Sequence, residues 1–160
     1  MDKWIWLDMD GTFVDLYGVK NWLADLQSLN TRPYEIARPL VNTWSLLGVL
    51  LWAKENGYNI GVISWLSRNP SVDYSERVTK AKLDWLKKYD LDFILDEVLI
   101  VPYGVNKSDV CQKYGYGILF DDEKPNRESW KCGKAVNPCE DLIKAILENI
   151  RQELTKSTSQ

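Results

Sequence analysis

The sequence predicts an α/β fold with three layers (αβα), in which helices cover both faces of a mainly parallel central sheet. A small helical insert is expected after the first strand. Two observations indicate this class. Short apolar runs alternate with segments of helical periodicity, as in chains built from βα units. The runs are also apolar at both odd and even positions, which is typical of strands that are buried on both faces.

The first predicted strand, residues 4–7, is a short apolar run with aromatic residues. Segment 16–39, which follows it, fits the alternation poorly. Its short helical pattern at Trp22, Leu23 and Leu26 precedes two Arg-Pro pairs. We therefore expect a small cap-like insert above the end of the first strand.

A helix is predicted over residues 40–54, and a second strand at 59–63 follows it. The apolar stripe of this helix comprises Trp44, Leu47, Leu51 and Trp52. Asn56-Gly57 is a common signal for a helix C-terminus. Another helix is predicted over 78–89, with an apolar stripe that comprises Val78, Ala81, Trp85, Leu86 and Tyr89. We interpret its charged face as solvated surface.

Three more strands complete the predicted sheet. Residues 98–101 and 117–120 are short apolar runs of the same kind as the first two, and a weaker run lies near Ala135 and Val136. The sequence contains no repeat, low-complexity tract or linker, so a second domain is not expected.

The last predicted helix has a clear start signal. Asn137 suits the N-cap, Pro138 suits the first helical position, and Glu140 stands where a capping-box partner would. The residues expected to dock it on the sheet are Leu142, Ile143, Ile146, Leu147 and Ile150. Residues 155–160 are small and polar, so we expect a frayed tail after a single domain at 1–154.

Composition excludes several classes of protein. The chain has 160 residues, of which 45% are hydrophobic, and this is enough to form the core of one domain. The net charge is −3 and charges are spread throughout, so no basic block of the kind that binds long nucleic acids is present. No apolar stretch approaches the roughly 18 residues needed to cross a membrane.

Cysteine and histidine usage narrow the chemistry further. Cys111, Cys132 and Cys139 form an odd set without a CxxC pair, and no charged apolar leader precedes the first strand, so we expect a cytoplasmic protein. Histidine is absent, which excludes imidazole bases, Ser-His-Asp triads and nearly all protein zinc sites. Carboxylates, hydroxyls, lysine and a hard metal ion remain.

Polar side chains stand where the predicted strands end. The first run ends at Asp8, the second at Ser64, and the fourth at Asp121 with Asp122. Lys107 follows the third run, near the start of a helix. Because ligands of open parallel sheets bind beyond the carboxyl ends of the strands, we expect these groups to converge at one edge.

Such a set of groups suits phosphoryl transfer. Mg²⁺ is commonly held by one or two carboxylates plus substrate phosphate, and Asp8 and Asp121 are candidates for this role. Asp10, two residues after a nucleophilic carboxylate, is placed to protonate a leaving oxygen and later to take a proton from water. Gly11 allows a sharp turn of the chain, and Thr12 helps to order it.

Four segments resemble the motifs of the haloacid dehalogenase (HAD) superfamily. DMDGT resembles its first motif, GVIS its second, the lysine in GVNKSDV its third, and GILFDDEKPN the paired-acid form of its fourth. All four occur in the family's order and bracket most of the chain. The resemblance implies a Rossmann-like core, Mg²⁺ and a covalent aspartyl-phosphate intermediate.

The resemblance also implies roles for the acids. Asp8 would be the nucleophile and a metal ligand. Asp10 would be the acid and base, with its backbone carbonyl on the metal. Asp121, with Asp122, would complete the metal site. Because successive strand residues point to opposite sides, we favour Asp121.

The implied phosphate-binding residues are Thr12, Ser64 and Lys107. Trp65, next to Ser64, is a candidate for lining the substrate mouth. Lys80 and Lys82 are alternative sources of the lysine, but their place in a helical stripe favours surface or stem packing. Arg32 and Arg38 in the insert are candidates for contacting a second anionic group.

The leading functional expectation is hydrolysis of a small phosphorylated compound, such as a nucleoside monophosphate, without a membrane or long nucleic acid as partner. The motifs most resemble the 5'(3')-deoxyribonucleotidase-like branch. Asp10 distinguishes DMDGT from the DKTGT motif of the family's transport ATPases, which has Thr at this position. A polynucleotide end phosphatase and a non-catalytic module that binds phosphorylated ligands are alternatives. A signalling receiver domain is disfavoured, because its phosphorylated Asp ends the third strand, where this chain has Val101-Pro102.

Overall fold

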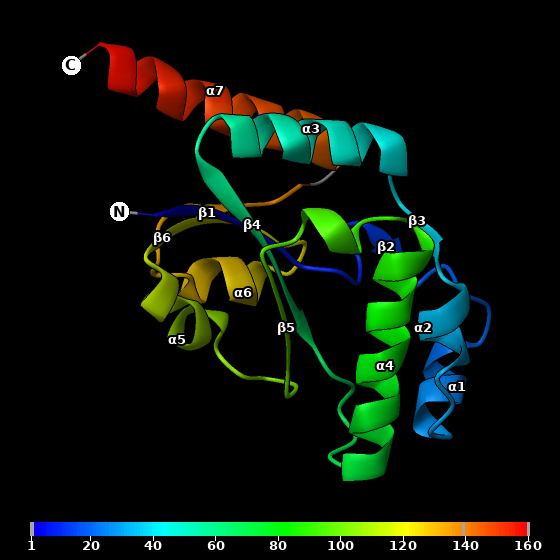
Figure 1. Ribbon diagram of the computed structural model, residues 1–160. Helices are drawn as coiled ribbons and strands as arrows, with labels where there is room; N and C mark the ends of the chain where they lie inside the picture. The colour runs from blue at the N-terminus through cyan, green and yellow to red at the C-terminus, as the bar shows by residue number, and fades with distance from the viewer. Residues whose placement is uncertain (1, 139, 160) are drawn as a thin grey trace.

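A five-stranded parallel sheet forms the centre of the computed structural model, which describes residues 2–138 and 140–159 (Figure 1). The strands lie in the order β5-β4-β1-β6-β7, and each adjacent pair is parallel. Their bounds are β1 Lys3–Leu7, β4 Tyr58–Trp65, β5 Glu97–Val101, β6 Tyr116–Phe120 and β7 Ala135–Val136. All five predicted strands are confirmed. Cys139 lies outside the described residues.

Helices cover both faces of the sheet, which confirms the three-layer α/β fold. Helices α3 (Thr43–Glu55) and α7 (Leu142–Thr158) lie over one face, and α5 (Lys107–Cys111) and α6 (Lys124–Ser129) over the other (Figure 1). Short 3₁₀ turns lie at Asp92–Ile94 and Gln112–Tyr114. Successive strand residues point to opposite faces, so Ile5 and Leu7 of β1 join the core with α3 and α7, whereas Trp4 and Trp6 pack on the α5 side.

None of the helices among the described residues has both the length and the apolar character of a membrane span.

Two glycines make room for Trp6 of β1. A Cβ atom at Gly61 of β4 would lie 2.3 Å from the ring of Trp6, and one at Gly117 of β6 would lie 2.7 Å from it. Trp4 and Trp6 stack on each other with ring centroids 4.9 Å apart. The neighbouring strands therefore hold β1, and the residues that follow Leu7, in the middle of the sheet.

The expected insert is present between β1 and α3. It consists of an antiparallel ribbon of β2 (Val14–Asp15) and β3 (Arg38–Pro39), with helices α1 (Trp22–Gln27) and α2 (Arg32–Ile36). Leu16 and Tyr34 of the insert form a buried cluster with Tyr74, Val78 and Ala81 of helix α4. Helix α4 spans Val72–Lys88. The insert is therefore attached to the domain through α4, and its helices lie alongside that helix (Figure 1).

The buried face of α3 differs from the predicted stripe. The helix buries Leu46, Val49, Leu50 and Ala53. Trp44 is 76% exposed and Leu51 44%, although both belong to the stripe we predicted. The segment is apolar around most of its circumference, so periodicity could not select the buried face. The helix itself and its end before Gly57 are confirmed.

Helix α7 begins and ends later than predicted. Its N-cap is Asp141, whose side chain accepts a hydrogen bond from the backbone N–H of Lys144, so the expected start at Asn137 and Pro138 is wrong. Aspartate is as good an N-cap as asparagine, and its position decides where the helix starts. Residues 155–158 are helical rather than frayed, and hydroxyl groups there donate to carbonyls of the preceding turn.

Glu153 ties α7 to the sheet at the edge opposite the carboxyl ends of the strands. Its carboxylate accepts hydrogen bonds from the hydroxyls of Tyr58 and Tyr116, the first residues of β4 and β6. Burial and this carboxylate raise the pKa of both tyrosines, so the hydroxyls stay protonated and can donate. The C-terminal helix is thus fastened to the sheet far from the strand ends that carry the polar residues.

Candidate active site

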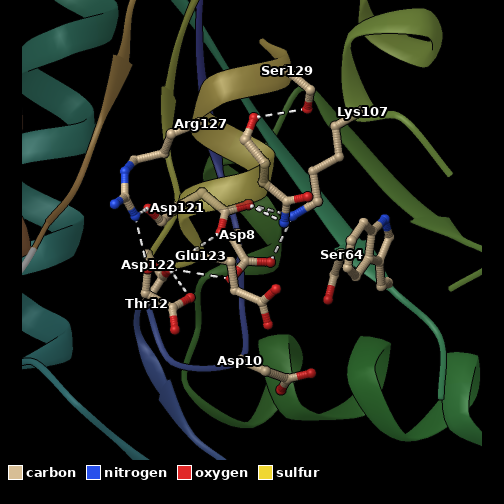
Figure 2. A network of polar contacts seen from close by, with 12 residues as sticks. Asp8, Asp10, Thr12, Ser64, Lys107, Asp121, Asp122, Glu123, Arg127 and Ser129 are labelled. Carbon is tan, nitrogen blue, oxygen red and sulfur yellow. Dashed lines mark hydrogen bonds and ion pairs between the residues drawn. The ribbon is translucent and has the colours of Figure 1, made fainter. Parts of the chain in front are cut away.

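Parallel register brings two aspartates together beyond the ends of β1 and β6. Leu7 pairs with Phe120, so Asp8 and Asp121 are the next residues of neighbouring strands. The backbone N–H of Asp8 donates to the carbonyl of Phe120 at 3.0 Å. Asp8 is 7% exposed and Asp121 0%. The expected convergence of these two side chains is present (Figure 2).

Lys107 supplies positive charge between these carboxylates. It is the first residue of α5, which Asn106 caps, and it is 2% exposed. Its ammonium donates to Asp8 Oδ1 at 2.8 Å and to Asp121 Oδ2 at 2.7 Å (Figure 2). Burial lowers the pKa of Lys107, but the two carboxylates outweigh burial and raise the pKa to about 12. The lysine is therefore charged and offsets the repulsion between the two acids.

Asp122 joins the same group of acids. Carboxylate oxygens of Asp8, Asp121 and Asp122 lie within 4.8 Å of one another. The Thr12 hydroxyl lies 3.2 Å from Asp8 Oδ2 and 3.3 Å from Asp122 Oδ1. The expectation that Asp121 and Asp122 point to opposite sides is wrong, because β6 ends before them and the chain turns. The turn is closed by the backbone N–H of Glu123, which donates to Asp121 Oδ1.

Three carboxylates this close favour a hard cation. Oxygen atoms are the ligands that Mg²⁺ prefers, and carboxylates are its usual protein ligands. Burial and the charge of Asp8 raise the pKa of Asp121, although Lys107 acts against the rise. The same two causes raise the pKa of Asp122 to about 7. A divalent cation would relieve this repulsion, so Asp8, Asp121 and Asp122 are the residues that could hold one.

Without divalent metal, the protein should lose stability as the pH rises from about 4 to about 7. Burial and Asp8 raise the pKa of Asp122 from 3.8 to about 7, so over this range the folded protein keeps a proton that the unfolded chain has released. The stability that this proton contributes is fully present below the pKa of Asp122 in the unfolded chain. It is lost as the pH rises through the pKa of Asp122 in the folded protein. Urea denaturation in EDTA at several pH values measures the slope. Asp122→Asn should flatten it, and an unchanged slope would show that Asp122 does not titrate this way.

Gly11 makes the approach of Asp122 possible. Its φ is 82°, and a Cβ atom at this position would lie 2.3 Å from Asp122 Oδ2. Any side chain at position 11 would therefore collide with the acid cluster as well as strain the backbone.

Gly11→Ala should lower the free energy of unfolding by about 1–3 kcal/mol and weaken Mg²⁺ binding. Gly104→Ala is the matched control, because φ there is 85° and, apart from its two chain neighbours, none of the described residues lies within 4 Å of a Cβ at that position. Urea denaturation and calorimetric Mg²⁺ titration of both variants measure the difference. Equal effects in the two variants would mean that strain alone, and not the contact with Asp122, explains the loss.

Asp10 pairs with a second buried lysine. Lys82 of α4 is 1% exposed and donates to Asp10 Oδ2 at 2.8 Å, to Ser64 Oγ at 2.7 Å and to the carbonyl oxygen of Trp65 at 2.8 Å. Ser64 lies within β4, which continues to Trp65. Our interpretation of Lys82 as surface or stem packing is wrong, whereas Lys80 on the same helix is exposed.

The place of Lys82 in its helix is the signal that we missed. It follows Val78 by four residues and precedes Trp85 by three, so it lies on the buried side of α4. A lysine within an apolar stripe needs a charged or polar partner, because burying an unpaired ammonium is costly. Asp10 and Ser64 are those partners.

Helix α6, which the sequence pattern did not predict, supports the acids. Asn126 Nδ2 donates to Asp121 Oδ2 at 3.0 Å. Arg127 Nη1 donates to the backbone carbonyls of Asp121 and Asp122 at 3.0 and 2.7 Å (Figure 2). Asn126 is the last residue of the segment that resembles the fourth motif, in which we considered only the paired acids, and Arg127 directly follows that segment. They fix the turn that aims the carboxylates.

A cavity of about 850 Å³ opens over Asp8 and Asp10. Its aromatic lining consists of Tyr17, Trp22, Tyr34, Trp65 and Tyr103. Trp65 therefore lines the cavity, as we expected of a residue at the substrate mouth, and its ring lies 4.9 Å from that of Tyr103. Arg68 is the cationic residue of the cavity lining, and our sequence analysis did not select it as a candidate. Its guanidinium lies 5.0 Å from the centroid of the Tyr103 ring. Of the two arginines expected there, Arg32 instead pairs with an aspartate of the insert.

The cavity floor thus offers groups for three tasks. Asp8 is a buried carboxylate with a charged partner, Asp10 is a second carboxylate with a partner of its own, and Asp121 and Asp122 extend the acid cluster beside Asp8. Such an arrangement can supply a nucleophile, a proton donor and acceptor, and a cation site around one bound group. No family model and no curated protein matches this chain.

Proposed function

We propose that this protein is a Mg²⁺-dependent phosphomonoester hydrolase that acts through an aspartyl-phosphate intermediate, as the resemblance to the HAD superfamily implies. One observation carries the proposal. Asp8 and Asp10 line the same cavity, yet each has its own buried lysine, Lys107 for Asp8 and Lys82 for Asp10. Two carboxylates in different charge environments suit two different catalytic roles.

Asp8 is the proposed nucleophile and Asp10 the acid and base. A carboxylate oxygen of Asp8 attacks phosphorus, the bond from phosphorus to the leaving oxygen breaks, and Asp10 gives that oxygen its proton. Water then attacks the phosphorus of the acyl phosphate, and Asp10 takes a proton from the water. Inorganic phosphate leaves, Asp8 recovers its carboxylate and Asp10 its proton. The cycle consumes only the ester and one water.

Lys107 and Ser64 are the proposed phosphate-binding residues. Lys107 contacts Asp8 and can neutralise the charge that the nucleophile receives with the phosphoryl group. The Ser64 hydroxyl accepts a hydrogen bond from Lys82, and an ammonium cannot accept one in return. The hydroxyl hydrogen of Ser64 is therefore available to a phosphoryl oxygen.

The acid cluster is the proposed Mg²⁺ site. Asp8, Asp121 and Asp122 would hold the ion, which when bound supplies positive charge for the phosphoryl oxygens. Thr12 contacts Asp8 and Asp122 through its hydroxyl, so we assign it to ordering these acids rather than to binding phosphate directly.

A nucleotide or a similar small phosphorylated compound is the proposed substrate. The cavity volume of about 850 Å³ lies in the range of sites for small organic ligands. Its lining is rich in aromatic rings, on which a planar base can stack. The ring of Trp65 lies 5.6 Å from the ammonium of Lys107 and packs against Tyr103. Nucleoside monophosphates are therefore the first compounds to test.

The test is phosphate release from p-nitrophenyl phosphate and from a panel of nucleoside monophosphates, with Mg²⁺ and with excess EDTA. We expect hydrolysis that requires Mg²⁺ and turnover of at least one nucleotide. Full activity in EDTA would contradict the metal-dependent mechanism. If the protein released phosphate from none of the phosphomonoesters tested, the result would contradict the proposed function itself.

A further inference from the structure

The ammonium of Lys82 has three hydrogens and three acceptors. These acceptors are Asp10 Oδ2, Ser64 Oγ and the Trp65 carbonyl oxygen, all at 2.7 or 2.8 Å. The ring centroid of Tyr34 lies 5.1 Å from the same nitrogen, and Lys82 is 1% exposed. Because each N–H already has a partner, Lys82 cannot donate to a substrate without breaking a bond inside the protein. Its contacts are those of a residue that holds other groups in place.

Separate lysines also keep the two aspartates of DMDGT apart. Lys107 reaches Asp8 from α5, and Lys82 reaches Asp10 from α4. In Figure 2 the side chain of Asp10 points away from the cluster around Asp8. The ion pair of Asp10 is therefore separate from the one that Lys107 forms with Asp8 and Asp121.

We propose that Lys82 is a positioning residue for Asp10, an inference that rests on the proposed phosphatase function. The ammonium holds Oδ2 of Asp10 in place and leaves Oδ1 to exchange a proton with the leaving group. Its bonds to Ser64 and Trp65 anchor the ammonium to β4. Asp10 is thereby held at the edge of the rigid sheet, where geometry is maintained best.

The test compares Lys82→Met with Lys80→Met. Methionine keeps much of the length of the side chain and removes its donors. Lys80, two residues earlier on the same helix, is exposed and pairs with Asp84, so it is the matched control. Each variant is assayed with p-nitrophenyl phosphate, whose leaving group departs readily, and with the nucleoside monophosphate that the wild type hydrolyses fastest, whose alkoxide needs a proton.

We expect Lys82→Met to lower kcat/KM for the nucleotide by about 10²-fold, the lower end of what acid catalysis provides. For p-nitrophenyl phosphate the loss should be less than about tenfold, because this leaving group needs little protonation. Asp10→Asn should show the same dependence on leaving group. The double variant should be no slower than Asp10→Asn alone, because Lys82 acts through Asp10.

If Lys82 had only a structural role, Lys82→Met would lower kcat/KM for both substrates by the same factor, and its effect would add to that of Asp10→Asn. Either result overturns the proposal. Rates like those of Lys80→Met overturn it as well. Should circular dichroism show that Lys82→Met does not fold, Lys82→Gln, which keeps two donors without charge, replaces it in the same comparison. An inactive wild type overturns the proposed function and this role together, whereas an active wild type that is indifferent to Lys82 overturns the role alone.

Discussion

Replacing Asp8 by asparagine should lower kcat for p-nitrophenyl phosphate on the order of 10⁴-fold or more. The amide has the shape of the carboxylate, but it is uncharged and a far weaker nucleophile, so the acyl phosphate cannot form. The backbone at residue 8 is placed by the register of β1 with β6 and not by the side chain. The variant is therefore expected to fold, and initial rates with saturating Mg²⁺ supply the measurement.

Two further measurements make the Asp8→Asn result specific. Asp84→Asn is the matched control, because Asp84 is an exposed partner of Lys80 on α4, and it should keep the wild-type rate. Wild-type protein quenched during turnover should carry a phosphoryl group, labile to hydroxylamine, on the peptide that contains Asp8. Wild-type activity in Asp8→Asn, or a phosphoryl group elsewhere, would exclude Asp8 as the nucleophile.

The part of the site that the sequence predicted is the part that a parallel sheet dictates. Asp8 and Asp121 follow runs too apolar to lie anywhere but in the interior, and the carboxyl ends of parallel strands meet at one edge. Lys107 follows another such run, at the start of a helix. Knowing the order of the strands was unnecessary for this expectation, because every parallel strand ends at the same edge.

The part that the sequence did not predict depends on how helices are rotated and placed. The apolar stripe of α4 indicates a buried side that includes Lys82, but it does not say which strand end the helix passes. That depends on the insert, since Tyr34 packs against α4. In α3 the pattern is apolar nearly all round, so only packing against α7 and the sheet decides that Trp44 is exposed.

Replacing Lys107 by methionine should lower the free energy of unfolding of the metal-free protein by about 3–5 kcal/mol. The variant leaves Asp8 and Asp121 buried without the ammonium that both contact, at 2.8 and 2.7 Å. An uncompensated buried charge costs far more than the ion pair contributes, because the remaining carboxylate has lost both water and its partner. Urea denaturation in EDTA at neutral pH measures the loss. Lys87→Met, at an exposed position of α4, is the control and should change stability little.

Mg²⁺ distinguishes the two roles that Lys107 has in this proposal. A cation held by Asp8, Asp121 and Asp122 supplies positive charge to the same acids, so Mg²⁺ should stabilise Lys107→Met more than it stabilises the wild type. Turnover should not recover with stability, because the ion does not replace the ammonium that neutralises the phosphorylated Asp8. A loss of stability below about 1 kcal/mol would place the pair among weak surface ion pairs. Recovery of both stability and turnover in Mg²⁺ would show instead that Lys107 serves only to hold the acids together.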